Sequence, residues 1–419
     1  MGRQRARPGP PKGTVSSNIN SISTDSCPKM DMWLPVSSVR VSWYRPVHLA
    51  QARAVRVSMK RSLLLVLFVL LVAVIAALYW YTRPLPVLTV TTWAGPYGRA
   101  QASAMMRPYG AQRAVDVRIA QWDGDLDELK HAVESRKFQG DVIDFELPAA
   151  VEACNRGWLQ KIDASTLPAG VDGTPAKDDF VAGAIGPCWV GSVVYSQVMI
   201  FSPSLKKPPT TLADFFDSKS FPGRRVLSRA SAKFNLEMAL IADGVAPGEV
   251  YRTLETPEGL DRAFAKLKAL NPIWAHDSVG AIGWVKNGQA AMATALNGDV
   301  YDSGRKDFAP GIIWDHQLYE LDAFAIPSGN PNKDRALDFI RFATGSAPLA
   351  GVAGWVPYGP ARHSALPLVK NNPELNLPML PHLPTAPQNF HHAFAVDDSW
   401  WYVHGAAIAT RWQAFVSGP

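Results

Sequence analysis

The sequence VLTVTTWAGPY (residues 87–97) joins a β-rich run to a Gly-Pro turn. The valines and threonines of its first part are typical of a strand, and Trp93 follows that strand directly. Strand and helix patterns then alternate, with helices predicted at 99–109 and 125–135 and strands at 115–119 and 140–145. This alternation predicts a parallel α/β sheet. Ligands of such sheets bind beyond the carboxyl ends of the strands, where we expect Trp93, Tyr97 and Glu146.

The same class of elements continues through the rest of the chain, without an internal repeat. The strongest helix signal covers 257–270, where Pro257 begins the helix, Glu258 lies in the first turn, and Leu260, Phe264 and Leu267 share one face. Further strands are predicted at 185–196, 198–201, 223–227, 290–295, 312–314 and 323–326. Further helices are predicted at 212–217, 235–241, 281–287, 333–343 and 400–415. Asn297-Gly298-Asp299 is interpreted as a turn after a strand.

An uncharged apolar run, Leu63 to Tyr81, follows Lys60-Arg61. Its length approaches the roughly 20 residues that a helix needs to cross a bilayer, and the basic flank predicts that the start stays cytoplasmic. Residues 59–83 are therefore either a cleaved signal peptide or a signal anchor. Val74-Ile75-Ala76 offers a cleavage site, whereas Trp80 and Tyr81 resemble interfacial anchors, so both readings stay open.

Residues 1–58 are rich in Pro, Ser and Arg and lack periodicity, which predicts a disordered basic extension. It is either a dispensable addition, because Met59 would itself begin a conventional export signal, or a basic cytoplasmic tail. The net charge of +6 arises here, since residues 1–61 contain 11 Lys and Arg against 2 acidic residues. The remainder carries −3, so nucleic-acid binding by the folded part is not indicated.

The three cysteines are Cys27, Cys154 and Cys188. In an oxidising compartment Cys154 and Cys188 could form a disulfide, or they could remain two buried thiols. No CxxC or Cys/His metal spacing occurs, and His391-His392 is interpreted as a loop pair with nothing nearby to complete a metal site. The sequence indicates no cofactor.

From about residue 86 onward, a series of stretches resembles the periplasmic solute-binding proteins of the spermidine/putrescine (polyamine) type. They lie in the family's order, at residues 87–97, 140–143, 156–163, 210–225, 287–299, 322–340 and 354–360. The resemblance implies a two-lobed periplasmic-binding-protein fold of type II, with each lobe a mixed sheet flanked by helices and a hinge between the lobes. It implies lobe 1 at 84–190 and 318–366, lobe 2 at 191–317, and a segment packing on lobe 2 at 367–419.

The function implied by the resemblance is the extracytoplasmic solute-binding component of an ABC importer. A monomer in the periplasm would close on a small cationic solute by hinge motion and deliver it to the permease and its ATPase. Aromatic rings and carboxylates suit such a solute through cation–π contacts and charge-assisted hydrogen bonds. A polyamine such as spermidine or putrescine is the expected class.

The resemblance assigns binding roles to Trp93 and Tyr97 as aromatic walls, to Asp299 and Asp322 as acids that grip an ammonium group, and to Tyr358 on the hinge side. The chain also departs from the family. Leu296 and Glu320 replace expected aromatic residues, and Glu146 and Glu320 are acids gained. The family's second-lobe acid pair falls near Ser231 and Phe234, beside Arg229 and Lys233. These two basic residues are expected to be solvated, but in the cleft they would suit a carboxylate and hence a zwitterion.

Two other function classes stay open. An exported hydrolase or transferase is one, although the sequence has no G-x-S-x-G, H-E-x-x-H, Walker loop or Cys-His candidate pair, so no enzyme is expected. Paired carboxylates leave acid/base chemistry possible. Binding of a metal ion or its chelate is the other, and no His/Tyr/Asp cluster at ligand spacing supports it.

Overall fold

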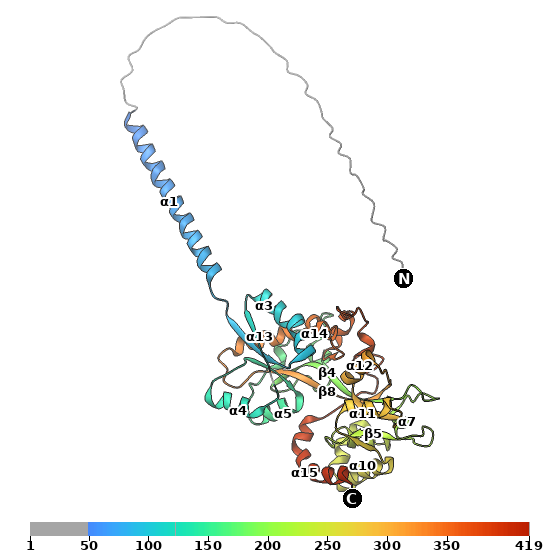
Figure 1. Ribbon diagram of the computed structural model, residues 1–419. Helices are drawn as coiled ribbons and strands as arrows, with labels where there is room; N and C mark the ends of the chain where they lie inside the picture. Colours follow the sequence, from blue (N-terminus) through green and yellow to red (C-terminus); the bar gives the residue numbers. More distant parts are fainter. Residues whose placement is uncertain (1–48, 122, 419) are drawn as a thin grey trace, which may run out of the picture. The chain divides into compact units, whose positions relative to one another are not determined.

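The computed structural model describes residues 49–121 and 123–418. The chain divides into two compact units, Met1–Arg83 and Pro84–Pro419. In the first unit, α1 (Leu49–Thr82) is a 34-residue helix (Figure 1). Its stretch Arg61–Trp80 is long and apolar enough to cross a membrane, a property that signal sequences share. The prediction of disorder was wrong for residues 49–58, because they form the beginning of α1. The rest of the predicted extension lies outside the described residues.

The second unit is built on one mixed sheet of ten strands. The central path has the order β2-β1-β3-β8-β4-β7-β5-β6, while β10 pairs with β8 and β9 pairs with β4. The strands are β1 (Val87–Thr92), β2 (Asp116–Gln121), β3 (Val142–Glu146), β4 (Trp189–Phe201), β5 (Arg225–Ser228), β6 (Ile273–Ala275), β7 (Met292–Leu296), β8 (Gly311–Ala325), β9 (Gly359–Pro360) and β10 (Phe394–Ala395).

Each end of this sheet is a parallel set, and the two sets are joined by antiparallel pairing. β1 pairs in parallel with β2 and β3, and β5 pairs in parallel with β6 and β7. Between them, β3 pairs antiparallel with β8, β8 with β4, and β4 with β7. The sequence prediction of a parallel sheet therefore holds within each end, and the mixed α/β fold is confirmed.

The long strands β4 and β8 run through both halves of the unit, and Figure 1 shows them between the two groups of helices. The sequence analysis divided each of them into two short strands. The division was wrong because the pairing between β4 and β8 continues from Trp189 opposite Ala325 to Phe201 opposite Gly311, with only two register shifts. A strand can continue through an irregular residue pattern when the neighbouring strand supplies hydrogen-bond partners for its backbone N–H and C=O groups.

Helices cover both halves of the sheet. The α-helices are α2 (Gly95–Gln101), α3 (Arg107–Arg113), α4 (Leu126–Ser135), α5 (Leu147–Asn155), α6 (Ala176–Asp179), α7 (Leu212–Phe216), α8 (Asn235–Ala242), α9 (Val250–Leu254), α10 (Pro257–Leu270), α11 (Ser278–Lys286), α12 (Asn297–Lys306), α13 (Lys333–Ala343), α14 (Ser346–Ala353) and α15 (Asp398–Ser417). The shorter helical segments are η1 (Ala102–Met106), η2 (Ala164–Thr166), η3 (Pro247–Glu249), η4 (His363–Leu368) and η5 (Leu380–His382). α10 and α13 match their predicted ranges, whereas α5, α12 and α14 were missed.

Two separate apolar cores correspond to two lobes. One core contains buried residues from β1, β3, α5 and α13, together with the parts of β4 and β8 near Val193 and Phe324. A second core, with a smaller cluster beside it, contains residues from α8, α10 and β7 and the opposite parts of β4 and β8, near Met199 and Ile313. The two long strands therefore belong to both cores.

The C-terminal residues divide between the cores. Trp400, Ile408 and Trp412 of α15 pack in the second core, and the Trp412 indole nitrogen donates to the carbonyl of Arg229 at 2.9 Å. Leu383 and Ala386 instead pack in a small cluster with Ala353 and Leu366. The segment 367–419 was predicted to pack on the second lobe; Phe394, Val396 and α15 pack in the second core, whereas Leu383 and Ala386 do not.

A disulfide joins Cys154 on α5 to Cys188, the residue before β4. It closes a loop of chain with a sequence separation of 34 residues. Such a loop reduces the conformational entropy of the unfolded chain, and a loop of this size is worth about 3–4 kcal/mol in the chain-entropy model.

Replacing both residues of this pair, as Cys154→Ser with Cys188→Ser, is expected to lower the free energy of unfolding by about 3–4 kcal/mol. Urea denaturation followed by circular dichroism measures the change. The Cys27→Ser variant keeps the disulfide and is the matched control, with no change expected. Equal midpoints for the double variant and the control would contradict the stabilising role.

Candidate functional site

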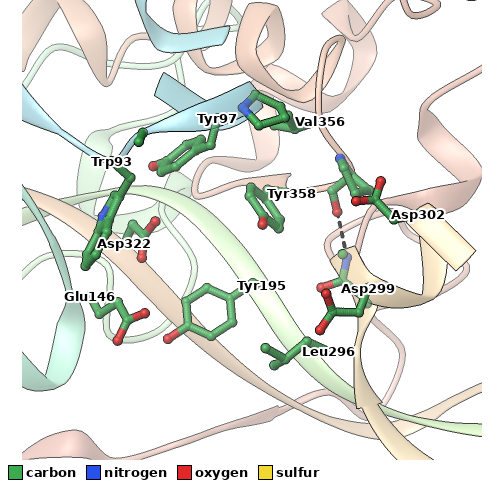
Figure 2. A pocket seen from close by; sticks show the side chains of 15 residues that line it. Trp93, Tyr97, Glu146, Tyr195, Leu296, Asp299, Asp302, Asp322, Val356 and Tyr358 are labelled. Carbon is green, nitrogen blue, oxygen red and sulfur yellow. Dashed lines mark hydrogen bonds between the residues drawn. The ribbon is translucent and has the colours of Figure 1, made fainter. Parts of the chain in front are cut away.

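A cavity of about 330 Å³ opens where β1 and β3 end, beside the middle of β4 and β8. Figure 2 shows Trp93, Glu146 and Asp322 on one side of it and Asp299 and Asp302 on the other. The complete lining is Trp93, Ala94, Pro96, Tyr97, Glu146, Tyr195, Leu296, Asn297, Gly298, Asp299, Asp302, Asp322, Val356, Pro357 and Tyr358. The cavity therefore combines side chains from both lobes.

Sheet register places the acids of the first wall. Glu146 ends β3, and Asp322 of β8 lies directly opposite it in the antiparallel pair. Trp93 follows β1, and Gly95, at φ 84°, turns the chain into α2 so that Tyr97 faces inward. This turn requires a positive φ that favours glycine.

The second wall is the beginning of α12. Asp299 lies in its first turn, and Asp302 follows three residues later on the same face. Asn297 connects this helix to its surroundings, because its side-chain oxygen accepts from the Ser196 N–H at 2.9 Å and its nitrogen donates to the Pro357 carbonyl at 2.6 Å (Figure 2). The sequence analysis interpreted Asn297 to Asp299 as a turn, and this was wrong because α12 begins there.

Aromatic rings separate the two walls. Tyr97 and Tyr358 meet edge to face with their ring centroids 5.5 Å apart. Gly298 allows the ring of Tyr358 to lie close to the start of α12, because a Cβ there would lie 3.2 Å from Cε1 of Tyr358. Burial raises the pKa of Tyr358 to about 12 and raises that of Tyr97 well above its ordinary value, so both phenols are neutral hydrogen-bonding groups.

A third carboxyl group, Asp144, is fully buried behind the first wall. It accepts hydrogen bonds from Gln101 Nε2 at 2.9 Å and from Ser192 Oγ at 3.3 Å. Burial raises the pKa of Asp144 to about 7. Burial, and then the neighbouring Asp144 and Glu146, hold the pKa of Asp322 well above its ordinary value, while burial followed by Glu320 raises that of Glu146. A cation entering the cavity would relieve this crowding of acids.

Of the seven predicted binding residues, six line the cavity: Trp93, Tyr97, Glu146, Asp299, Asp322 and Tyr358. Their role in binding stays a prediction. Glu320 does not line it. Its carboxylate is buried, forms an ion pair with Lys233, and accepts from the Tyr195 hydroxyl at 3.0 Å.

Lys233 was expected to be solvated, and it is instead largely enclosed between Glu320 and Asp398, with its side chain 16% exposed and Nζ 3.2 Å from Asp398 Oδ1. Burial alone disfavours its ammonium, but the two carboxylates outweigh burial and raise the pKa of Lys233. Two acids separated from Lys233 by long stretches of chain are brought to it by folding, which no local pattern in the sequence indicates.

The sequence analysis missed Tyr195 and Asp302 in the lining and Asp144 behind it. Asp302 could have been predicted from its spacing, because it follows Asp299 by three residues and a helix places such residues on one face. The prediction of a turn in place of a helix hid this relation. Tyr195 projects from the middle of β4, and its direction depends on the register with β8.

Comparison with known proteins now identifies the family. Residues 104–377 match the model of the bacterial extracellular solute-binding protein family, and the chain belongs to that family. The gamma-aminobutyric acid-binding protein of Pseudomonas aeruginosa is 33% identical over 333 residues, which cover 79% of this chain and 91% of that protein. The protein is therefore the solute-binding component of an ABC transporter, and its family is extracytoplasmic.

Solved structures support the same fold. An ABC transporter substrate-binding protein from Bradyrhizobium japonicum has a TM-score of 0.65 and 26% identity, and the match covers 79% of this chain and 99% of that one. The structure of the Atu4243 GABA receptor has a TM-score of 0.63 and 27% identity, covering 78% and 97%.

The polyamine resemblance is more distant than the sequence motifs suggested. The spermidine/putrescine substrate-binding protein PotD of Streptococcus pneumoniae has a TM-score of 0.59 at 14% identity, covering 79% of this chain and 99% of that one. A likeness at this identity supports the fold alone.

The raised pKa values predict how stability depends on pH. The folded protein holds protons on Asp144 and Asp322 at pH values where the unfolded chain has released them, so the free energy of unfolding falls as the pH rises from about 4 to about 7. Asp322→Asn removes one of the crowded charges and keeps the shape. At pH 8 this variant is expected to melt higher than the wild-type chain, and at pH 4 the difference should largely vanish.

Thermal unfolding of ligand-free protein at both pH values measures this. Asp178→Asn is the control, because Asp178 is exposed and outside the cavity. A lower melting temperature for Asp322→Asn at pH 8 would show that the carboxylate stabilises the empty protein, contrary to the argument.

Proposed function

We propose that this protein captures a small amino acid whose ammonium and carboxylate groups stand at opposite ends, of the gamma-aminobutyric acid type, and presents it to an ABC permease. The single observation that carries the proposal is the acidic wall formed by the exposed Glu146 and the buried Asp322, backed by the buried Asp144, in a cavity whose fifteen lining residues include no Lys, Arg or His. A site of this kind favours a ligand that supplies the missing positive charge.

The first wall suits a primary ammonium group. The carboxylates of Glu146 and Asp322 can accept charge-assisted hydrogen bonds, and the ring of Trp93 beside them offers a cation–π surface (Figure 2). The gain on binding includes relief of the repulsion that raises the pKa of Asp322.

Arg229 is the candidate partner for the ligand's carboxylate. It follows the carboxyl end of β5, and the parallel register of β5 with β7 places it level with Leu296, which lines the cavity. Its backbone is held on both sides, by Ala275 and by the Trp412 indole. Within residues 49–121 and 123–418, its guanidinium has no ion pair or hydrogen-bond partner. Closure of the lobes would bring this free charge toward the cavity.

A diamine or polyamine is the second candidate. It is favoured by the position of the acids, since Glu146 and Asp322 lie on one wall and Asp299 and Asp302 on the other. A ligand with an ammonium group at each end would satisfy both walls without Arg229. The names of the two GABA-binding relatives support the first candidate over this one.

We propose that the lobes comprise 84–190 with 318–366, and 191–317 with α15, and that they close by bending β4 and β8. The division of the apolar cores supports these limits, because the first core contains residues from Leu88 to Val194 and from Tyr319 to Ala365. Closure around a solute is the general behaviour of two-lobed binding proteins, and the closed form is what the permease would receive.

Calorimetric titration with gamma-aminobutyrate, putrescine and spermidine tests the ligand class. Gamma-aminobutyrate is expected to bind, and Arg229→Gln should weaken it by about 10- to 100-fold, the cost of a lost charge-assisted hydrogen bond. Asp322→Asn should weaken gamma-aminobutyrate and putrescine alike. Arg224→Gln, an exposed arginine before β5, is the matched control and should change nothing.

The outcomes separate the candidates. Putrescine binding that is tighter than gamma-aminobutyrate binding and indifferent to Arg229→Gln favours the polyamine reading. Gamma-aminobutyrate affinity that survives Arg229→Gln refutes the carboxylate assignment, and affinity that survives Asp322→Asn refutes the site itself. Turnover of any of these compounds would favour an enzyme instead.

We also propose that α1 remains attached as a membrane anchor. The guanidinium of Arg83 lies over the rings of Tyr79 and Trp80, at 5.3 and 5.4 Å from their centroids, which is an arrangement suited to the membrane interface. After expression in a bacterial host, the protein is expected to stay in the membrane pellet through an alkaline carbonate wash. Recovery of a soluble periplasmic form whose first residue lies after position 76 would show a cleaved signal instead.

A further inference from the structure

A second cluster of potential ligands lies away from the cavity. Asp315 and His316 of β8 meet His392, which precedes β10, and one ligand atom from each residue lies within 4.8 Å of the others. The two contacts are 3.0 Å, from Asp315 Oδ2 to His316 Nδ1, and 3.1 Å, from Asp315 Oδ1 to His392 Nδ1. The sequence analysis found nothing near His391-His392 to complete a metal site, and folding supplies the missing residues from 77 positions earlier in the chain.

The cluster is built on an irregularity in β8. Met199 of β4 pairs with Ile313 and Gln197 pairs with Leu318, so the residues 314–317 of β8 stand opposite a single residue of β4. At this bulge His316 adopts a left-handed backbone, with φ 50°, and His392 does the same with φ 61°. Successive side chains of a regular strand point to opposite faces, and a bulge interrupts this alternation. Asp315 and His316 are neighbours in sequence, yet the bulge lets both side chains contribute to one cluster.

The loop that carries His392 is held on the bulge by other contacts. Gln317, fully buried, donates from Nε2 to the carbonyls of Pro384 at 2.9 Å and Asn389 at 2.6 Å. β10 then pairs with β8 directly after His392, with Phe394 opposite Leu318. The hydrogen bonds of Gln317 and the pairing of β10 with β8 therefore hold His392 next to Asp315.

One nitrogen in the cluster lacks a hydrogen bond. Nδ1 of His316 is buried and has no hydrogen-bond partner, since its contact with Asp315 has the distance but not the alignment of a hydrogen bond. Oδ2 of Asp315, in contrast, accepts from the Leu212 N–H at 2.9 Å, which fixes the carboxylate. A ligand-bearing carboxylate held by an outer hydrogen bond is the usual arrangement at metal sites.

We propose that Asp315, His316 and His392 bind one Zn²⁺ ion at the β8 bulge, with water completing the coordination. Imidazole nitrogen with carboxylate oxygen suits zinc among the divalent ions, rather than Ca²⁺ or Mg²⁺, which prefer oxygen ligands alone. Zinc bonds of about 2.0–2.2 Å separate tetrahedral ligand atoms by about 3.4 Å, which is close to the 3.0 and 3.1 Å contacts already present. The ion would join the segment before β10 to the strand that both lobes share.

Zinc titration of the full chain tests the site. The protein is purified in detergent without a histidine tag, treated with EDTA, dialysed and titrated calorimetrically with ZnCl₂. One ion per chain is expected, and His392→Asn should weaken binding at least tenfold. Asparagine suits this variant because it tolerates a left-handed backbone, and the side chain of His392 is 53% exposed, so the fold should be retained. His131→Ala, an exposed histidine on α4, is the control and should bind zinc as the wild type does.

A second measurement uses Co²⁺ in place of zinc. The wild-type chain should show the visible absorption bands of a tetrahedral cobalt site, and His392→Asn should lose them. Equal zinc affinity in wild type and His392→Asn, or titration without a one-to-one saturable phase, would overturn the proposal. Titration with gamma-aminobutyrate in the presence of EDTA is independent of this site, so failure of the zinc site and failure of the solute site are distinguishable.

Discussion

The antiparallel pairing of β4 with β8 is the constraint on which the rest of the molecule depends. It joins two parallel sheets into one and carries the backbone from one apolar core to the other. It also places Tyr195 and Asp322 in the cavity and lets β3 bring Glu146 opposite Asp322. Because β4 and β8 are the strands that cross between the cores, the proposed closure of the lobes would bend these two strands.

The electrostatics of the cavity follow from that pairing. Register forces Asp322 and Glu146 into adjacent positions, and Asp144 is buried behind them. Burying several carboxyl groups together is unfavourable unless they share protons or a cation, and the raised pKa values of Asp144 and Asp322 express this cost. If the proposed function is correct, an ammonium group that enters the cavity relieves this repulsion, and the relief contributes to the affinity.

A second group of acidic residues is compensated by a lysine of the protein itself. Lys233, Glu320 and Asp398 come from three distant segments outside the cavity lining, and the ammonium of Lys233 pairs with both carboxylates. This network connects the second lobe, the long strand β8 and the start of α15, and none of its three side chains lines the cavity. Glu320 and Asp322 are two residues apart on one strand, yet Glu320 pairs with Lys233 and Asp322 lines the cavity.

The sequence by itself determined the α/β class, the apolar helix ahead of the folded part, the range of α10 and α13, and the residues Trp93, Tyr97, Glu146, Asp299, Asp322 and Tyr358 that line the cavity. The elements and the placement of Trp93, Tyr97 and Glu146 follow from local patterns: periodicity, helix signals and residues at strand ends. Asp299, Asp322 and Tyr358 were implied by the resemblance to the polyamine-binding family. Only the tertiary structure decided that β4 and β8 are single strands, that Glu320 pairs with Lys233, and that Asp315 and His316 meet His392. The physical reason is that each of these depends on register or on contact between distant segments, and a shift of one residue in register turns a side chain to the opposite face of the sheet.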